Sequence, residues 1–143
     1  MYLIVNEKVV QGKIPEFIPA HEKGYPKVIP TLRYFMQLEG NVVIGYTCYV
    51  NMGDFYFVGN TYIRPESRGQ GHYKNLLKER NKILNDKPKI TLVNPIQGTD
   101  INILERQVLR GGGIKINSYT QVEHIMGQTV YDGMYHLPMY MYR

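Results

Sequence analysis

Apolar and polar residues alternate in several stretches of the first half of the chain, with the two-residue period of strands. Residues 2–10 form one such stretch, and others follow at 32–38, 42–50 and 55–63. Turns that contain glycine join these last three, which is typical of hairpins. The pattern predicts an antiparallel meander over residues 31–63. In its middle strand we expect one face to carry Val42, Ile44, Tyr46, Cys48 and Val50.

The period changes to that of a helix beyond residue 71. Positions at helical spacing run to a stop before Pro88 and comprise Tyr73, Leu76, Leu77, Arg80, Ile83 and Leu84. This helix leads to a short predicted strand at 89–93. Because a helix connects the strand at 55–63 to the strand at 89–93, the two should be parallel.

The rest of the chain adds one more helix, at 100–110, which three glycines end, and two strands at 114–120 and 134–142. Four prolines between residues 11 and 30 exclude a long helix in that segment. The order of elements predicts a mixed sheet in a single α/β domain of the α+β kind over residues 1–143. With 43% hydrophobic residues, the chain can build the core of one such domain.

Composition narrows the classes of partner and compartment. Seventeen Lys and Arg against twelve Asp and Glu give a net charge of +5, which suits a nucleic acid, an anionic cofactor or an acidic protein. The only cysteine, Cys48, excludes an internal disulfide and a cysteine-based zinc cluster, and we expect a packed core thiol. No apolar run reaches about 18 residues and no leader pattern opens the chain, so we expect a cytoplasmic protein without a membrane span. The densest basic stretch should lie on an exposed face; it comprises Lys74, Lys78, Arg80, Lys82, Lys87 and Lys89.

Residues 62–77 combine the features of an anion-binding site. A predicted strand ends at Tyr62 and Ile63, and the loop Arg68-Gly69-Gln70-Gly71 then opens directly into a helix. Glycines let backbone N–H groups approach a ligand, and a helix start adds unpaired donors and a partial positive charge. With the cation of Arg68, these groups suit a phosphate. The alternative is a simple turn into a helix, since the loop lacks the endings of nucleoside-triphosphate and dinucleotide loops.

This loop resembles motif A of the GCN5-related N-acetyltransferases (GNAT), which runs Arg/Gln-x-x-Gly-x-Gly/Ala. Arg68 and Gly71 match its first two fixed positions, whereas Tyr73 replaces the last small residue. Asn102 and the pair Gly113-Ile114 stand at the spacing of a later signature of the family. The order of predicted elements is also similar. The resemblance implies a GNAT-like fold, in which the meander is followed by the motif-A helix, a parallel strand, a helix and a terminal strand pair.

The resemblance further implies acetyl-CoA, or another acyl-CoA, as co-substrate, without a metal. The strand would contact the pantetheine through its backbone, the loop and helix start would hold the pyrophosphate, and two asparagines would contact the pantetheine arm. The residues so implied are Tyr62, Ile63, Arg68, Gly69, Gln70, Gly71, His72, Tyr73, Asn94 and Asn102. The alternatives are a strand-ending turn for Asn94 and an ordinary first-turn position for Asn102.

The catalytic positions of the family are not filled in the expected way. Many members carry a tyrosine as proton donor where this chain has Leu109, which cannot donate a proton. Tyr119 is the candidate substitute donor, with packing as its alternative role. A base is also needed because an alkyl amine is mostly protonated at neutral pH, yet residues 55–63 contain no carboxylate. Candidate bases elsewhere, each with an ordinary surface role as the alternative, are Glu39, Asp54, His72, Glu123 and His124.

Three functions therefore remain open. The first is an acyltransferase that moves an acetyl group from acetyl-CoA to an amine by direct attack in a ternary complex. The amine could belong to a small molecule, a protein or a nucleic acid, and a homodimer is compatible with the sequence. The second is an acyl-CoA-binding module that has lost the chemistry, as Leu109 and the missing strand carboxylate suggest. The third is a nucleic-acid-interacting protein, which the charge and the thirteen tyrosines would allow.

Overall fold

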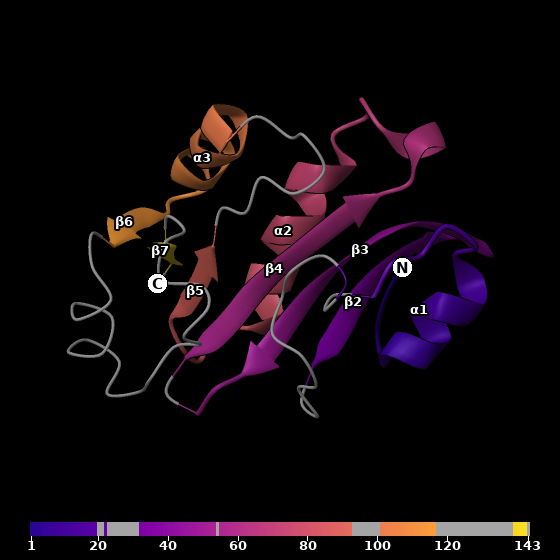
Figure 1. The fold of residues 1–143 in the computed structure, drawn as a ribbon, viewed down its shortest axis with the longest axis horizontal. Helices are drawn as coiled ribbons and strands as arrows, with labels where there is room; N and C mark the ends of the chain where they lie inside the picture. The colour runs from indigo at the N-terminus through magenta and orange to yellow at the C-terminus, as the bar shows by residue number, and fades with distance from the viewer. Residues whose placement is uncertain (20–21, 23–31, 54, 93–100, 117–138, 143) are drawn as a thin grey trace. The chain divides into compact units, whose positions relative to one another are not determined.

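The computed structural model describes residues 1–19, 22, 32–53, 55–92, 101–116 and 139–142 (Figure 1). Within these residues the chain forms strands, α-helices and a short 3-10 helix (η2). In chain order they are β1 (Tyr2–Val5), α1 (Glu7–Lys13), β2 (Arg33–Glu39), β3 (Val42–Asn51), β4 (Tyr56–Ile63), η2 (Pro65–Ser67), α2 (His72–Ile83), β5 (Lys89–Leu92), α3 (Ile101–Arg110), β6 (Ile114–Ile116) and β7 (Met139–Tyr142). The seven described strands form one sheet in the order β1-β2-β3-β4-β5-β7-β6. Contacts group the chain into two units, 1–50 with 59–84 and 51–58 with 85–143.

The start of the chain departs from the prediction of a strand over 2–10. The strand β1 stops at Val5, and α1 begins two residues later. The side chain of Asn6 caps this helix, because its Oδ1 accepts a hydrogen bond from the backbone N–H of Val9 at 3.1 Å. Val10 and Ile14, four residues apart and fully buried, give the segment one apolar side. The Asn6 cap and the burial of two apolar residues four positions apart favour a helix here, although the short alternating pattern favoured a strand.

The antiparallel meander is confirmed. The strand β2 is antiparallel to β1 on one side and to β3 on the other. The backbone N–H of Arg64 donates to the carbonyl of Ile44 at 2.9 Å, while the hydroxyls of Thr47 and Thr61 lie 2.8 Å apart. Contacts that run in opposite directions along the chain show that β4 is antiparallel to β3.

The predicted face of the middle strand is wrong at its start. Leu38 pairs with Val43 but Gln37 pairs with Gly45, so Ile44 is an extra residue in β3. Such a bulge shifts the alternation by one residue. Val43, not Val42, therefore lies in the same core cluster as Tyr46 and Cys48, and Val42 is 56% exposed.

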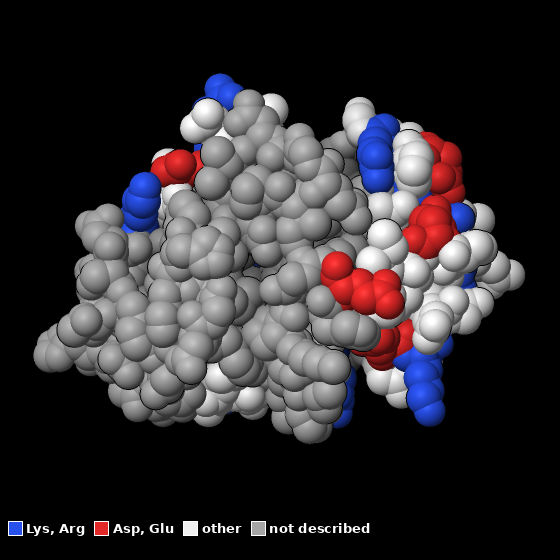
Figure 2. All heavy atoms as spheres, viewed as in Figure 1, with Lys and Arg blue, Asp and Glu red and all other residues white. Residues whose placement is uncertain are grey.

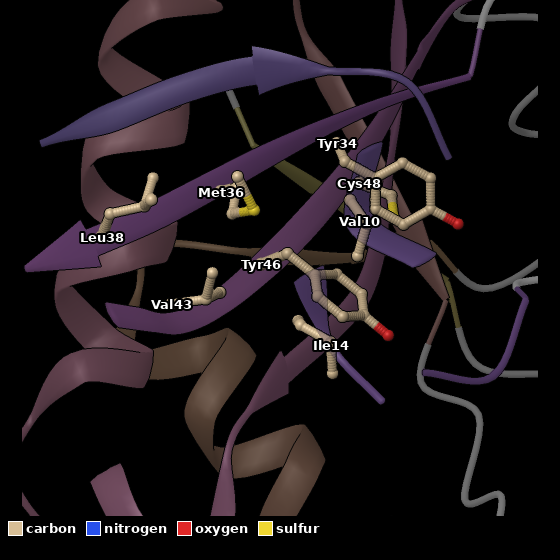
Figure 3. Packing of buried hydrophobic residues seen from close by; sticks show 8 residues of the cluster. All are labelled: Val10, Ile14, Tyr34, Met36, Leu38, Val43, Tyr46 and Cys48. Atoms are coloured by element: carbon tan, nitrogen blue, oxygen red, sulfur yellow. The ribbon is translucent and has the colours of Figure 1, made fainter. Parts of the chain in front are cut away.

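The two helices of the first unit pack on opposite faces of its strands. Val10 of α1 and Ile14, the residue that follows this helix, pack on one face with Tyr34, Met36, Leu38, Val43, Tyr46 and Cys48 (Figure 3). Leu76 of α2 packs on the other face with Phe35 and Ile63. Residues 34, 36 and 38 alternate with residue 35 along β2, as the two-residue period requires. The prediction that Cys48 is a packed core thiol is confirmed.

The helix α2 ends at Ile83, before Pro88 as predicted, but its charges are not all exposed. Arg80 is only 2% exposed, and its Nη1 donates to Thr47 Oγ1 at 2.9 Å. Lys89, at the start of β5, is also 2% exposed, and its Nζ donates to the carbonyl of Lys87 at 3.0 Å. The prediction of a wholly exposed basic stretch is wrong at Arg80 and Lys89. Arg80 lies within α2 and Lys89 at the start of β5, and the rest of the protein covers both side chains, whereas Lys74 and Lys78 are exposed.

The second unit contains the predicted parallel pair. Residues 56–58 of β4 pair in parallel with 89–91 of β5, and β7 joins β5 and β6 as their antiparallel neighbour. The predicted second helix is α3, and the glycines end it. The backbone N–H of Gly113 donates to the carbonyl of Val108, that of Gly112 donates to Leu109, and Gly112 has φ +91. This arrangement is the Schellman motif, which needs a left-handed residue after the helix.

Candidate functional site

The loop between β4 and α2 is held at its entry and open at its glycines. Hydrogen bonds from Arg64 N–H to the Ile44 carbonyl and from Ser67 N–H to the Arg64 carbonyl, both 2.9 Å, fix its entry. Gly69 and Gly71 then adopt φ of +77 and +81, which glycine reaches without steric cost. A Cβ built at either glycine would meet no atom within 4 Å. The backbone of the loop is therefore open on the side where side chains are missing.

The start of α2 keeps its backbone donors free of a side-chain cap. Gly71 stands at the N-cap and makes no side-chain hydrogen bond, and the first turn contains no acidic residue. Helix starts without such a cap leave N–H groups and a partial positive charge for another acceptor. The predicted succession of strand, glycine loop and helix is confirmed, and its geometry suits an anion.

Arg68 is oriented toward the end of β4. Its Nε donates to the carbonyl of Ile63 at 2.8 Å, and its Cζ lies 5.5 Å from the centroid of the Tyr62 ring. A guanidinium over an aromatic face gains a cation–π attraction, and the carbonyl bond fixes its direction. Arg68 therefore adds a positioned positive charge at the loop rather than a mobile one.

A carboxylate that the sequence pattern did not indicate lies beside the same strand end. Glu16 forms an ion pair with Arg64, with Oε1 3.2 Å from Nη2, and it also hydrogen-bonds to Tyr62. Arg64 contacts a second carboxylate, Glu66, at 3.3 Å. Glu16 and Arg64 are 48 residues apart in the chain, so no local motif connects them. The sequence analysis expected a strand over 2–10 and so missed α1, the helix whose end precedes Glu16 by three residues.

The pKa values of Glu16 and Tyr62 move in opposite directions. Burial raises the pKa of Glu16, but hydrogen bonds from its own backbone and from Arg64, together with the charge of Arg64, lower it more. Burial and the negative charge of Glu16 raise the pKa of the Tyr62 hydroxyl. At neutral pH Glu16 is therefore an anion, and Tyr62 is a neutral hydroxyl that donates to it.

The middle of β4 contains a left-handed residue. Asn60 has φ +51 and is 6% exposed, and its Nδ2 donates to Cys48 Sγ at 3.4 Å. Such a conformation is rare without glycine and needs support from its surroundings. Nearby, a Cβ on Gly45 would collide with the carbonyl oxygen of Tyr62 and lie 2.9 Å from Ile63 Cδ1. The absence of a side chain at Gly45 thus lets β3 approach the end of β4 closely.

His72 and Tyr73 open α2 on the side of the helix that packs against the sheet. His72 Nδ1 lies 3.3 Å from Nε2 of Gln37 on β2, and the Gln37 side chain is buried. Tyr73 packs against the cluster of Phe35, Ile63 and Leu76. Tyr73 thus faces the core, which accounts for a large residue where the GNAT motif has a small one. Burial raises the pKa of its hydroxyl.

The structure brings eight of the implied ligand residues together in the first unit, at consecutive or nearly consecutive positions: Tyr62, Ile63, Arg68, Gly69, Gln70, Gly71, His72 and Tyr73. The other two are not among them. Asn102 lies on α3 in the second unit and is exposed, and its carbonyl accepts a hydrogen bond from Arg106 Nε at 3.3 Å. Asn94 lies outside the described residues.

Of the candidate catalytic residues, Tyr119, Asp54, Glu123 and His124 lie outside the described residues. Glu39 ends β2 and is exposed. Leu109, at the position of the family's proton donor, lies on α3 and is 47% exposed. Among the residues that the structure describes, no three His, Cys, Asp or Glu side chains are grouped as metal ligands. No helix in the described part of the chain is long and apolar enough to cross a membrane.

No protein-family model and no curated protein sequence matches the chain. Solved structures do match. Tetrahymena GCN5 has a TM-score of 0.63 at 14% identity, covering 98% of this chain and 95% of that one. The chain has the GNAT fold.

Two further structures support this assignment. An acyl-CoA N-acyltransferase from Pseudomonas aeruginosa has a TM-score of 0.61 at 12% identity, covering 100% of this chain and 99% of that one. The PaiA N-acetyltransferase of Thermoplasma acidophilum, solved in complex with coenzyme A, has a TM-score of 0.54 at 14% identity, covering 79% and 61%. The sheet with one parallel pair, predicted for a GNAT fold, is thus confirmed.

Proposed function

We propose that the protein is an acyltransferase that moves an acetyl group from acetyl-CoA to an amine. The observation that carries this proposal is the loop of Gly69 and Gly71, with open space over both glycines, followed by a helix start without a side-chain cap. In a protein of the GNAT fold, this loop is the segment that resembles the pyrophosphate-binding motif. The CoA-bound structure of similar fold adds to the case.

The cation of Arg68 and the open backbone at Gly69 and Gly71 support acyl-CoA as the ligand. The backbone N–H groups from Gly69 to Tyr73 would bind the pyrophosphate, and the cation of Arg68 would add a charge-assisted contact. Backbone groups of Tyr62 and Ile63 would contact the pantetheine, with Asn94 and Asn102 as further polar contacts. The neutral amine would form the new C–N bond as the C–S bond of the thioester breaks. The amine then gives up one proton, so CoA leaves as a thiol when that proton goes to sulfur and as a thiolate when it goes to water.

We further propose that Glu16 contributes to recognition of the amine. An ionised carboxylate beside β4 attracts a protonated amine, and the ion pair with Arg64 orients it. A carboxylate whose pKa is lowered is a weak base, so its contribution would be binding rather than proton removal. Tyr119 remains the proposed donor to the leaving thiolate.

Binding without turnover is the second candidate function, and Leu109 favours it. Its side chain cannot donate a proton from the position where many GNAT enzymes carry a tyrosine.

The first test is calorimetric titration with CoA and acetyl-CoA, in which we expect saturable binding of both. The second test follows release of free thiol from acetyl-CoA with amines, amino acids, peptides and nucleosides. Thiol release above the rate without protein supports the enzyme; CoA binding without it supports the binding module; absence of CoA binding rejects both.

A further inference from the structure

The ring of His72 is held by an amide from another element. Gln37 Nε2 on β2 lies 3.3 Å from His72 Nδ1, across 35 positions of the chain. In this orientation of the Gln37 amide the NH2 group is the donor, and His72 Nδ1 is the acceptor. The neutral ring then carries its hydrogen on Nε2. The Gln37 contact therefore selects the tautomer whose other nitrogen is a donor.

The Gln37 side chain is not explained by packing. It is 8% exposed, and its Oε1 has no hydrogen-bond partner. A buried acceptor without a partner loses its bonds to water and is destabilising. Its register partner on β1 is Tyr2, and Phe35 precedes it on the same face of β2, so its surroundings on the sheet are apolar and aromatic. A methionine of similar length would fill this space without the unpaired oxygen.

We propose that His72 binds an anionic phosphate oxygen through Nε2–H, and that Gln37 is the positioning residue that orients its ring. His72 directly follows Gly71, so its own backbone N–H belongs to the uncapped first turn of α2. It would add a side-chain donor to a site otherwise built from backbone donors and Arg68. This inference rests on the proposed function, because the anion it assigns is the pyrophosphate of CoA.

A double-mutant cycle on CoA affinity tests the pair. His72→Phe should weaken CoA binding by about tenfold, as expected for one hydrogen bond to a charged oxygen. Gln37→Met should weaken it by several-fold in the wild-type background and not at all in the His72→Phe background. Its thermal midpoint should be unchanged or higher, because the unpaired oxygen is gone. As a matched control, Gln107→Met on the exposed face of α3 should leave CoA affinity unchanged.

Equal CoA affinity in wild type and Gln37→Met would overturn the proposal, as would an equal loss in both backgrounds. A second readout determines the tautomer of His72 in the wild-type protein before any ligand is added. Ring-nitrogen NMR of ¹⁵N-histidine protein reports the tautomer of His72 directly. We expect the hydrogen on Nε2, with a shift of this signal when CoA is added. A hydrogen on Nδ1 alone would reject the positioning role even if CoA binds, whereas absence of CoA binding to the wild type would reject the proposed function.

Discussion

The Arg80 guanidinium is a buried charge that donates hydrogen bonds to neutral side chains. Its Nη1 donates to Thr47 Oγ1, its Nε and Nη2 donate to Asn81 Oδ1 at 3.1 and 3.0 Å, and Thr47 in turn contacts Thr61. Burying a charge is costly, and hydrogen bonds offset part of that cost. At the scale of single residues, the sequence analysis expected Arg80 on an exposed face, and it did not predict the Thr47 hydroxyl on β3 that accepts from the guanidinium.

Thr47→Val should therefore destabilise the protein more than Arg80→Met does. The valine removes an acceptor and leaves a donor of a buried cation without it, which costs about 1–3 kcal/mol. The methionine removes the charge as well as the contact, so its cost should be smaller. Urea unfolding of the single and double variants measures the difference. If Thr47→Val is as damaging in the Arg80→Met background as in the wild type, the hydroxyl does not act through Arg80.

Gly71→Val should abolish binding of CoA while most of the fold remains. The new side chain would enter the open space over the loop and would strain a residue with φ +81. Gly112→Val is the matched control, because Gly112 has φ +91 and similarly open surroundings in the second unit. Calorimetry should show no CoA binding to the first variant and normal binding to the second. Unchanged affinity in Gly71→Val would place the anion site elsewhere.

The lowered pKa of Glu16 predicts that the free energy of unfolding depends weakly on pH in the acid range. A carboxyl whose pKa is lowered in the folded protein adds stability above its unfolded pKa, and this contribution is lost as the pH falls through the folded value. Its side chain is 36% exposed, so solvent screening keeps the contribution below about 1 kcal/mol. Glu16→Gln should lower the thermal midpoint slightly at pH 7, and the difference should shrink as the pH falls through the lowered pKa of the wild-type carboxyl. A larger loss at the lower pH would have the wrong sign for this ion pair.

The helix α1 shows at the scale of elements why the first prediction failed. The doublet Val9-Val10 fits a strand as well as a helix over so few residues, and strand propensity favours valine. The Asn6 cap and the burial of Val10 and Ile14 on the sheet decide in favour of the helix. Longer segments such as α2, with several turns of consistent spacing, were predicted correctly. The bulge at Ile44 was not predicted, because residues 42–44 are all apolar and an extra apolar residue among them cannot be recognised from the pattern.

Asn6→Ala should destabilise the first unit by about 1 kcal/mol, the usual cost of losing a side-chain cap. Asn6→Asp should keep most of the stability, since a carboxylate accepts the same bond and suits the positive end of the helix. Denaturant unfolding compares the two variants. Equal losses would show that the cap bond to Val9 contributes little.

At the scale of the whole molecule, the order of elements was predictable because it follows from local periods and one rule on parallel strands. The contacts that build the candidate site were not, since they join residues far apart: Glu16 with Arg64, and Gln37 with His72. Each depends on which elements become neighbours in the sheet. The single domain over 1–143 stays a prediction.

The net charge of +5 should give only weak, salt-sensitive binding to nucleic acid. Over the described residues that are visible in Figure 2, basic and acidic side chains lie beside one another rather than forming one basic surface. The protein should therefore be retained on mixed-sequence DNA at low salt and released at about 150 mM salt, where charges more than about 8 Å apart are largely screened from one another. Firm retention at that salt would favour the nucleic-acid-binding alternative.

Gly45 has a consequence for how the chain tolerates mutation. It has no reactive group, yet any side chain there would collide with the carbonyl of Tyr62, one residue before the last position of β4. In a saturation library selected for folding alone, Gly45 should be depleted of every replacement, whereas Gly71 should accept some. Selection for CoA capture should deplete both. The difference between the two selections would separate the glycine that shapes the sheet from the glycine that leaves room for a ligand.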